Sequence, residues 1–180
     1  PALVTINIDS VPVNHAPKTY NNYASTMEDT PVAVVLFASD PDGDPLTYNL
    51  VTNPEHGNLS GTGPNMQYTP APDYNGSDSF QYSVSDGQLE SNVSTMYISI
   101  LPVNDTPVAN AQTVSVKAGE TIEIVFEGSD ADGDPLTLYY IDNTTKGTLW
   151  DTDTPNATMY SAWANSTGTD SFHIVASDGQ

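Results

Sequence analysis

The chain has 180 residues and carries 23 acidic against 3 basic side chains, which gives a formal net charge of −20 at pH 7. Phosphate binding needs a basic face, so we expect no nucleic-acid partner. No apolar run reaches the length of about 18 residues that spans a bilayer, so we expect no membrane insertion. Cysteine is absent, which excludes a disulfide framework.

The chain consists of two copies of one unit. The segment Val11–Pro17 recurs as Leu101–Pro107, and the acidic segment Ser39–Thr47 recurs as Ser129–Thr137. The second copy gains two residues between Leu149 and Tyr160. These matches predict a first module over 14–103 and a second over 104–180, with residues 1–13 forming the last strand of a preceding module or of a neighbouring chain's module.

Period-2 alternation predicts short strands in the first copy over 32–37, 46–51, 58–60, 66–69, 79–85 and 93–101. In the last two, alternate residues are large and apolar: Phe80, Tyr82 and Val84, then Met96, Ile98 and Ile100. Turn residues separate the strands at short intervals. We therefore expect an all-β protein of two tandem Greek-key β-sandwich modules, with about seven strands in each.

The acidic segments carry three aspartates at alternate positions. They are Asp40, Asp42 and Asp44 in the first copy and Asp130, Asp132 and Asp134 in the second. Carboxylates held together in a tight turn repel one another, and a hard cation such as Ca²⁺ relieves that repulsion. A solvated Asp-Gly-Pro turn is the alternative, and the repetition favours metal. The segment is not an EF-hand loop, because Pro45 and Val51 stand where that loop has Gly and Glu.

Four segments resemble the cadherin-like and immunoglobulin-like tandem repeats of large bacterial surface proteins and adhesins. They are Glu28–Val32, Ala38–Tyr48, Tyr74–Tyr82 and Pro102–Pro107. The resemblance covers nearly the whole chain. It implies an extracellular or cell-surface location and a non-enzymatic role as a structural or adhesive extender of a fibre or adhesin, with adjacent repeats as partners.

The resemblance also implies Ca²⁺ at the junctions between successive modules. The implied ligands at the junction of the two copies are Glu28, Asn104, Asp105, Asp130, Asp132, Asp134 and Asp178. The start of the first copy offers Asp40, Asp42 and Asp86, with Asp44 in the same turn, but His15 stands where the second copy has Asp105. A neutral imidazole is a poor Ca²⁺ ligand, so we expect that site to be weaker or to rely on a preceding repeat.

Catalysis finds little support in the sequence, because none of the three histidines recurs in the other copy. Carbohydrate binding is the rival function. Trp150 and Trp163 occur only in the second copy and flank its insertion, and a sugar ring could stack on an exposed indole. The alternative is that both tryptophans cover an edge or face of the sandwich.

The second copy ends at Gln180, the counterpart of Gln88, whereas residues 1–13 correspond to 91–103. One interpretation is a piece of a longer array. The other is strand donation, in which Leu3–Val11 of one chain completes the second module of the next. That contact is head-to-tail, so its repetition would build a fibre from identical chains.

Overall fold

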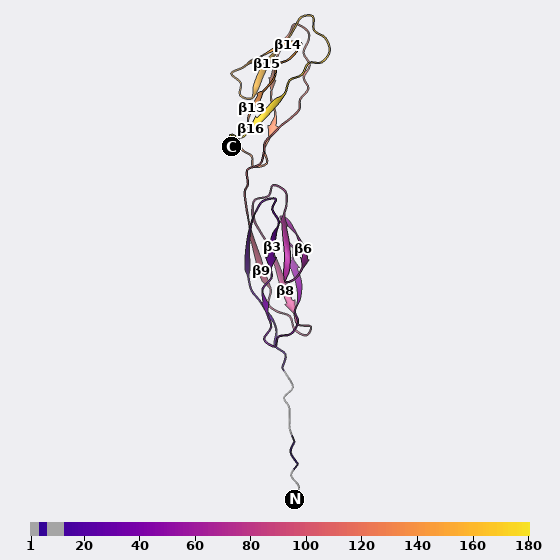
Figure 1. Cartoon of the computed structure of the whole chain (residues 1–180), viewed down its shortest axis with the longest axis vertical. Coiled ribbons are helices and arrows are strands. Elements are labelled where there is room, and N and C mark those ends of the chain that lie inside the picture. The colour runs from indigo at the N-terminus through magenta and orange to yellow at the C-terminus, as the bar shows by residue number, and fades with distance from the viewer. Residues whose placement is uncertain (1–3, 7–12) are drawn as a thin grey trace. The chain divides into compact units, whose positions relative to one another are not determined.

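The computed structural model describes residues 4–6 and 13–180, and every regular element in this part is a β-strand (Figure 1). The chain divides into two compact units, one up to Val103 and one from Asn104. No helix in the described part is long and apolar enough to cross a membrane. The all-β prediction is confirmed.

The first unit is a sandwich of two sheets. Its strands are β1 (Lys18–Thr19), β2 (Asn22–Met27), β3 (Val32–Val35), β4 (Ala38–Ser39), β5 (Thr47–Thr52), β6 (Gly57–Thr62), β7 (Asn65–Pro70), β8 (Gly76–Ser85) and β9 (Ser94–Leu101). One sheet has the order β2-β9-β8-β5 and the other β3-β7-β6, while β1 pairs with β4. Strand β2 runs parallel to β9, and the other pairs are antiparallel.

The core of the first unit follows the predicted alternation. Phe80, Tyr82 and Val84 of β8 are fully buried, and so is every second residue of β9 from Met96 to Ile100. They pack against Val34 and the other buried residues of the opposite sheet. The predicted strands and their inward faces are therefore confirmed.

Strands β1 and β2 are absent from the sequence-based prediction. In β2 the large apolar residues Tyr23 and Met27 point outward and are exposed, whereas the smaller Ala24 and Thr26 face the core. The apolar pattern therefore does not mark the buried face. Strand β2 forms because the neighbouring β9 satisfies its backbone groups.

The second unit repeats this plan with fewer strands. They are β10 (Val108–Ala109), β11 (Thr121–Val125), β12 (Gly128–Ser129), β13 (Thr137–Tyr140), β14 (Gly147–Asp151), β15 (Ala157–Ala162) and β16 (Ile174–Ser177). The sheets have the orders β11-β15-β14, β13-β16 and β10-β12. Ile124, Phe126, Leu138 and Tyr160 form the centre of its core.

Within 104–180 no strand corresponds to β9, and residues 112–117, the counterpart of β2, have no strand assignment. Of residues 1–13, only 4–6 and 13 belong to the described part. Most of the predicted donor segment Leu3–Val11 thus lies outside it, and its assignment to another module stays a prediction.

Candidate metal sites

The first acidic turn follows β4 directly. Asp40 Oδ1 accepts the backbone N–H groups of Asp42 at 2.8 Å and of Asp44 at 3.1 Å. These bonds hold the backbone in a tight turn, with Gly43 in the left-handed region at φ 81°. As a result, the three aspartates offer carboxylate oxygens that all lie within 4.8 Å of one another.

Residues that precede β1 bind this turn. The His15 backbone N–H donates to Asp42 Oδ2 at 2.7 Å, and His15 Nδ1 lies 3.1 Å from Asp42 Oδ1. Asn14 donates from its side chain to Asp86 Oδ2 at 2.8 Å. The backbone bond from His15 lowers the pKa of Asp42, while the negative charge of Asp86 opposes that shift. Backbone N–H groups, first that of Leu89, lower the pKa of Asp86.

The second unit repeats the same network. Asp130 Oδ1 accepts the N–H of Asp134 at 3.1 Å, and the Asp105 N–H donates to Asp132 Oδ2 at 2.8 Å. Asn104 donates to Asp178 Oδ2 at 2.8 Å, and this bond lowers the pKa of Asp178. Asp130, Asp132 and Asp134 also offer oxygens within 4.8 Å of one another. Each unit therefore brings its own predicted acids together.

In both turns the first aspartate keeps one carboxylate oxygen that is shielded from water. Asp40 Oδ2 and Asp130 Oδ2 have no hydrogen-bond partner among the described residues. A buried acceptor without a partner costs about 1–3 kcal/mol, and more when it is charged. A bound cation would remove this cost, and the donor set of hard oxygens fits Ca²⁺.

Glu28 follows β2 and is 3 % exposed. Its Oε1 accepts the backbone N–H of Val103, whereas its Oε2 is buried and has no hydrogen-bond partner in the described part. Glu28 thus carries a shielded oxygen of the same kind as Asp40 and Asp130. That Glu28 joins the acidic residues of the second copy in binding a metal ion stays a prediction.

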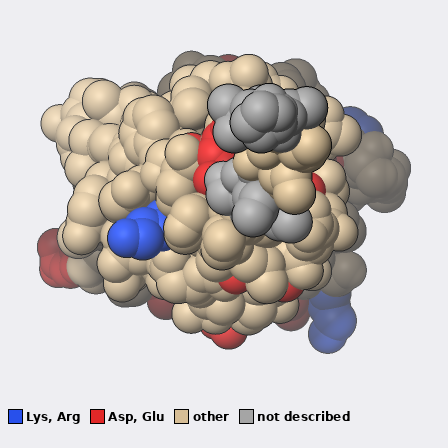
Figure 2. Space-filling view, turned by 90° about the horizontal axis from the view of Figure 1, so that it is seen from below, with Lys and Arg blue, Asp and Glu red and all other residues tan. Residues whose placement is uncertain are grey.

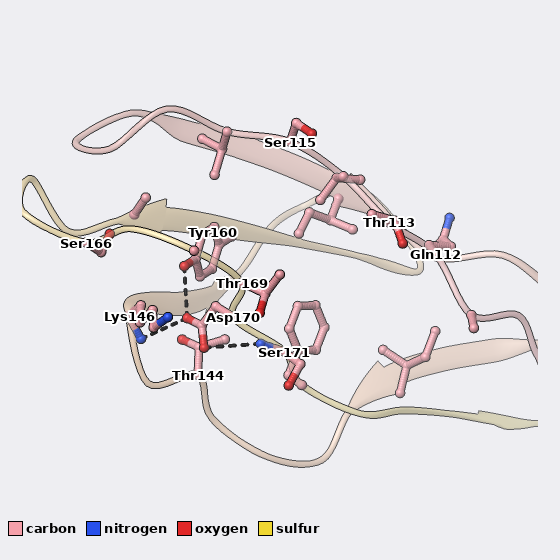
Figure 3. Close-up of a pocket in the computed structure, with 18 of the residues that line it drawn as sticks. Gln112, Thr113, Ser115, Thr144, Lys146, Tyr160, Ser166, Thr169, Asp170 and Ser171 are labelled. Carbon is pink, nitrogen blue, oxygen red and sulfur yellow. Dashed lines mark hydrogen bonds between the residues drawn. The ribbon is translucent and has the colours of Figure 1, made fainter.

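Two aspartates have a structural role that the sequence analysis did not predict. Asp78 accepts the N–H groups of Glu55 and His56 and the hydroxyl of Tyr68. Asp170 does the same in the second unit, with Thr145, Lys146 and Tyr160 as donors. Figure 3 shows the bonds from Lys146 and Tyr160. Burial acts to raise the pKa of Asp170, but these hydrogen bonds outweigh it and lower the pKa to about 2.

The Asp78 carboxylate therefore connects the loop before β6 to Tyr68 of β7. The Asp170 carboxylate connects the loop before β14 to Tyr160 of β15 in the same way. Both carboxylate oxygens of Asp78 accept hydrogen bonds from protein donors. The repeat of Asp-Ser-Phe in the two copies was the signal for this role. It could not be interpreted without the position of the tyrosines.

The two tryptophans share the outward face of one sheet. Trp150 lies on β14 opposite Met159, and the Trp163 backbone N–H donates to Lys146 just before β14. Trp163 Nε1 also donates to Thr148 Oγ1 at 3.4 Å. The indoles are 42 % and 54 % exposed. Trp163 lies opposite Lys146, which is four residues before Trp150, so the backbone positions of the two tryptophans are about 13 Å apart along the strand.

The lysines do not form a basic surface on the face shown in Figure 2, where blue atoms appear as separate spots among tan and red ones. The Lys117 ammonium lies 3.9 Å from Glu120, and Lys146 donates to the Thr167 carbonyl at 2.9 Å.

Several solved structures are similar to the chain. Human protocadherin-24 EC1-2 is 18 % identical, with 92 % of this chain and 94 % of that chain covered and a TM-score of 0.44. Protocadherin Gamma B2 extracellular cadherin domains 3-6 are 16 % identical, with 89 % and 46 % covered and a TM-score of 0.46. An endo-fucoidan hydrolase from glycoside hydrolase family 107 is 20 % identical, with 95 % covered and a TM-score of 0.43.

The chain spans only 28 % of that hydrolase. Similarity at this level assigns no function. No curated protein matches the sequence.

The family comparison is specific. The bacterial Ig domain model matches residues 14–99 and matches again over 104–180. The two matches cover the two units, with their Ig-like sheets and their repeated acidic turns. The chain therefore belongs to the bacterial Ig domain family and carries two of its repeats.

Proposed function

We propose that the chain is a non-enzymatic, Ca²⁺-binding repeat segment of an extracellular surface protein, with a structural or adhesive role. One observation carries the proposal. Each acidic turn holds three carboxylates within 4.8 Å and shields an unpartnered oxygen of its first aspartate. A hard cation satisfies that oxygen and offsets the repulsion between the carboxylates.

The donor chemistry selects the ion. The groups around the second turn are carboxylates and amides, and the first turn has the His15 imidazole in addition. Neither turn has a thiolate, since the chain has no cysteine. Ca²⁺ accepts six to eight oxygen ligands in flexible geometry, whereas Mg²⁺ demands a near-ideal octahedron. Asp42 and Asp132 lie on exposed turns, where the surrounding solvent can complete an irregular ligand shell. Such turns suit the more tolerant ion, so we expect Ca²⁺ to bind in preference to Mg²⁺.

The proposed location is consistent with the expected affinity. Extracellular Ca²⁺ modules have dissociation constants of about 0.1–1 mM, which extracellular calcium can saturate and cytosolic calcium cannot. A net charge of −20 opposes compaction, and bound cations reduce that opposition. The role would then be to keep the repeats folded and stiff where calcium is plentiful.

Thermal unfolding in Ca²⁺ and in EGTA tests the proposal. At a free Ca²⁺ concentration about 100-fold above Kd, each site that exists only in the folded state adds about 2.7 kcal/mol. We expect the melting temperature to fall by several degrees or more in EGTA, since a small domain has about 5–15 kcal/mol of stability. Equal concentrations of Mg²⁺ should restore little of the loss. Identical melting in Ca²⁺ and EGTA would overturn the proposal.

Carbohydrate binding is a second candidate, favoured by the two half-exposed tryptophans on one sheet face. Two indoles on one sheet face could stack on separate sugar rings of one polysaccharide. Binding to an array of polysaccharides should then be lost in Trp150→Ala and Trp163→Ala. Tyr139→Ala is the matched control, because Tyr139 is equally exposed on a strand of another sheet. Absence of binding by the unaltered chain removes this candidate.

A further inference from the structure

One outward sheet face of the first unit carries a pair of stacked aromatic rings. Tyr23 of β2 lies opposite Tyr97 of β9 in the parallel register of these strands. The ring centroids are 5.2 Å apart, and 17° separates the ring planes. Tyr23 is 73 % exposed, and Tyr97 is 42 % exposed although Tyr23 covers one face of its ring. Both rings are therefore accessible from solvent.

The sheet around this pair presents no charged side chain of its own strands to solvent. The odd-numbered residues of β2, β8 and β9 point outward, and apart from the two tyrosines they are serine, threonine, glutamine and two apolar residues. Asp78, the one acid within β2, β5, β8 and β9, faces the core. Glu90 of the following loop contacts Ser83, four residues along β8 from the level of the rings. The surface beside the rings is therefore uncharged.

An uncharged face with an aromatic pair does not occur on every sheet of this chain, whose net charge is −20. On the sheet that carries the tryptophans, Glu123 of β11 and Asp151 of β14 are exposed. The second unit also has Thr113 at the position that corresponds to Tyr23. The fold therefore requires neither the aromatic ring at this position nor the absence of charge around it.

Polar side chains without a partner in the protein lie beside the rings. Ser79 is opposite Tyr97 in the pairing of β8 with β9, and Gln81 is opposite Thr95. Within the described part of the chain, nothing forms a hydrogen bond with the Gln81 side-chain amide or with the hydroxyls of Ser79, Thr95, Tyr23 and Tyr97. These groups can therefore donate to and accept from a ligand.

We propose that this face binds an uncharged polysaccharide of β-linked hexoses. Such a sugar ring has C–H groups on its two faces and hydroxyl groups around its rim. The C–H face stacks on an exposed ring of Tyr23 or Tyr97. The rim hydroxyls bind the free amide and hydroxyl groups beside the rings, first those of Gln81 and Thr95.

Charge selects this ligand over other occupants. Two chains of net charge −20 repel each other, and the face has no cation that would offset this repulsion, so a second copy is disfavoured. An anionic polysaccharide is disfavoured for the same reason. The proposal rests neither on calcium nor on the tryptophans, because no acidic turn and no residue of the second unit belongs to the face.

Calorimetric titration in EGTA, with hexamers of β-1,4-linked glucose and mannose as probes, tests the proposal. At least one hexamer should bind the unaltered chain, and polygalacturonate should not. Tyr23→Ala and Tyr97→Ala should each weaken binding by about tenfold, whereas Tyr23→Phe should retain it. Gln81→Ala should weaken binding severalfold. Gln67→Ala is the matched control, because Gln67 is exposed on the opposite sheet.

An aromatic pair on neighbouring strands also stabilises a sheet, so the test reads binding at a temperature where each variant is folded by circular dichroism. The proposal is overturned if neither hexamer binds, or if polygalacturonate binds equally well. It is also overturned if binding survives Tyr23→Ala and is lost in Trp150→Ala or Trp163→Ala, which would place the sugar on the second unit. A dimer in light scattering that Tyr23→Ala abolishes would overturn it in favour of a contact between copies.

Discussion

At the scale of single residues, the two repeats differ most where their acidic turns meet the preceding segment. The Asp132 carboxylate accepts the N–H of Asp105, while Asp42 accepts the N–H of His15 and also lies against its ring. In both units a backbone N–H of the preceding segment binds the second aspartate of the turn, while the side chain at that position differs. The second turn therefore has one more carboxylate beside it than the first.

Exchanging these residues should exchange the calcium response of the units. Asp105→His should weaken Ca²⁺ binding by the second unit by about tenfold, since the charge of the ligand set tunes affinity. The Ca²⁺-dependent rise in melting temperature seen by tryptophan fluorescence should shrink. His15→Asp should leave that signal unchanged and enlarge the rise seen by circular dichroism. Equal tryptophan responses in both variants would contradict this assignment.

The half-buried Asp170 leads to a second prediction, which concerns pH. Its pKa is about 2 in the folded unit and about 3.9 in an unfolded chain. A lowered folded pKa means that the stabilisation is complete above the unfolded value and is lost as pH falls through the folded value. Asp170→Asn should therefore cost about 1–2 kcal/mol at pH 7 and very little near pH 2.

Denaturant unfolding followed by tryptophan fluorescence measures this difference, because Trp150 and Trp163 both lie in the second unit. Tyr160→Phe removes one donor to the same carboxylate and serves as the milder control. A destabilisation by Asp170→Asn that stays constant from pH 7 to pH 2 would show that the carboxylate charge is not its cause.

At the scale of elements, the sequence predicts strands well where large apolar residues face the core. The alternation in β8 and β9 marks their buried faces directly. It does not predict β2, where Tyr23 stacks on Tyr97 outside the sandwich with 5.2 Å between ring centroids. Nor could it predict the Asp78 and Asp170 contacts, because these join loops to strands through tertiary packing.

The acidic turns were predictable as clusters, because short spacing alone places their carboxylates together. Their bonds to Asn14 and Asn104 depend on how the chain enters each sandwich, and only the structure places them. The two shielded oxygens likewise became visible only with the packing around Asp40 and Asp130.

Matched phenylalanines compare the packing of the two cores. Phe80→Ala should cost about 3–5 kcal/mol, since Phe80 is fully buried. Phe172→Ala should cost clearly less, because Phe172 is only half-buried. Circular dichroism and tryptophan fluorescence during denaturant unfolding separate the two units. Equal losses would mean that the core around Phe172 is packed as tightly as the core around Phe80.

At the scale of the whole molecule, two Ig-like repeats share one acidic chemistry in a chain of net charge −20. General screening by salt would reduce repulsion everywhere, whereas a built site responds to one ion at a few residues. Calcium should act at the acidic turns rather than over the surface as a whole.

A Ca²⁺ titration followed by backbone amide resonances measures this most directly, at constant ionic strength and with Mg²⁺ as the control. The account predicts saturable shifts centred on Gly43 and Gly133, inside the two turns, with dissociation constants of about 0.1–1 mM and the tighter one at Gly133. Small shifts spread evenly over the chain, equal for Ca²⁺ and Mg²⁺ and without saturation, would contradict it.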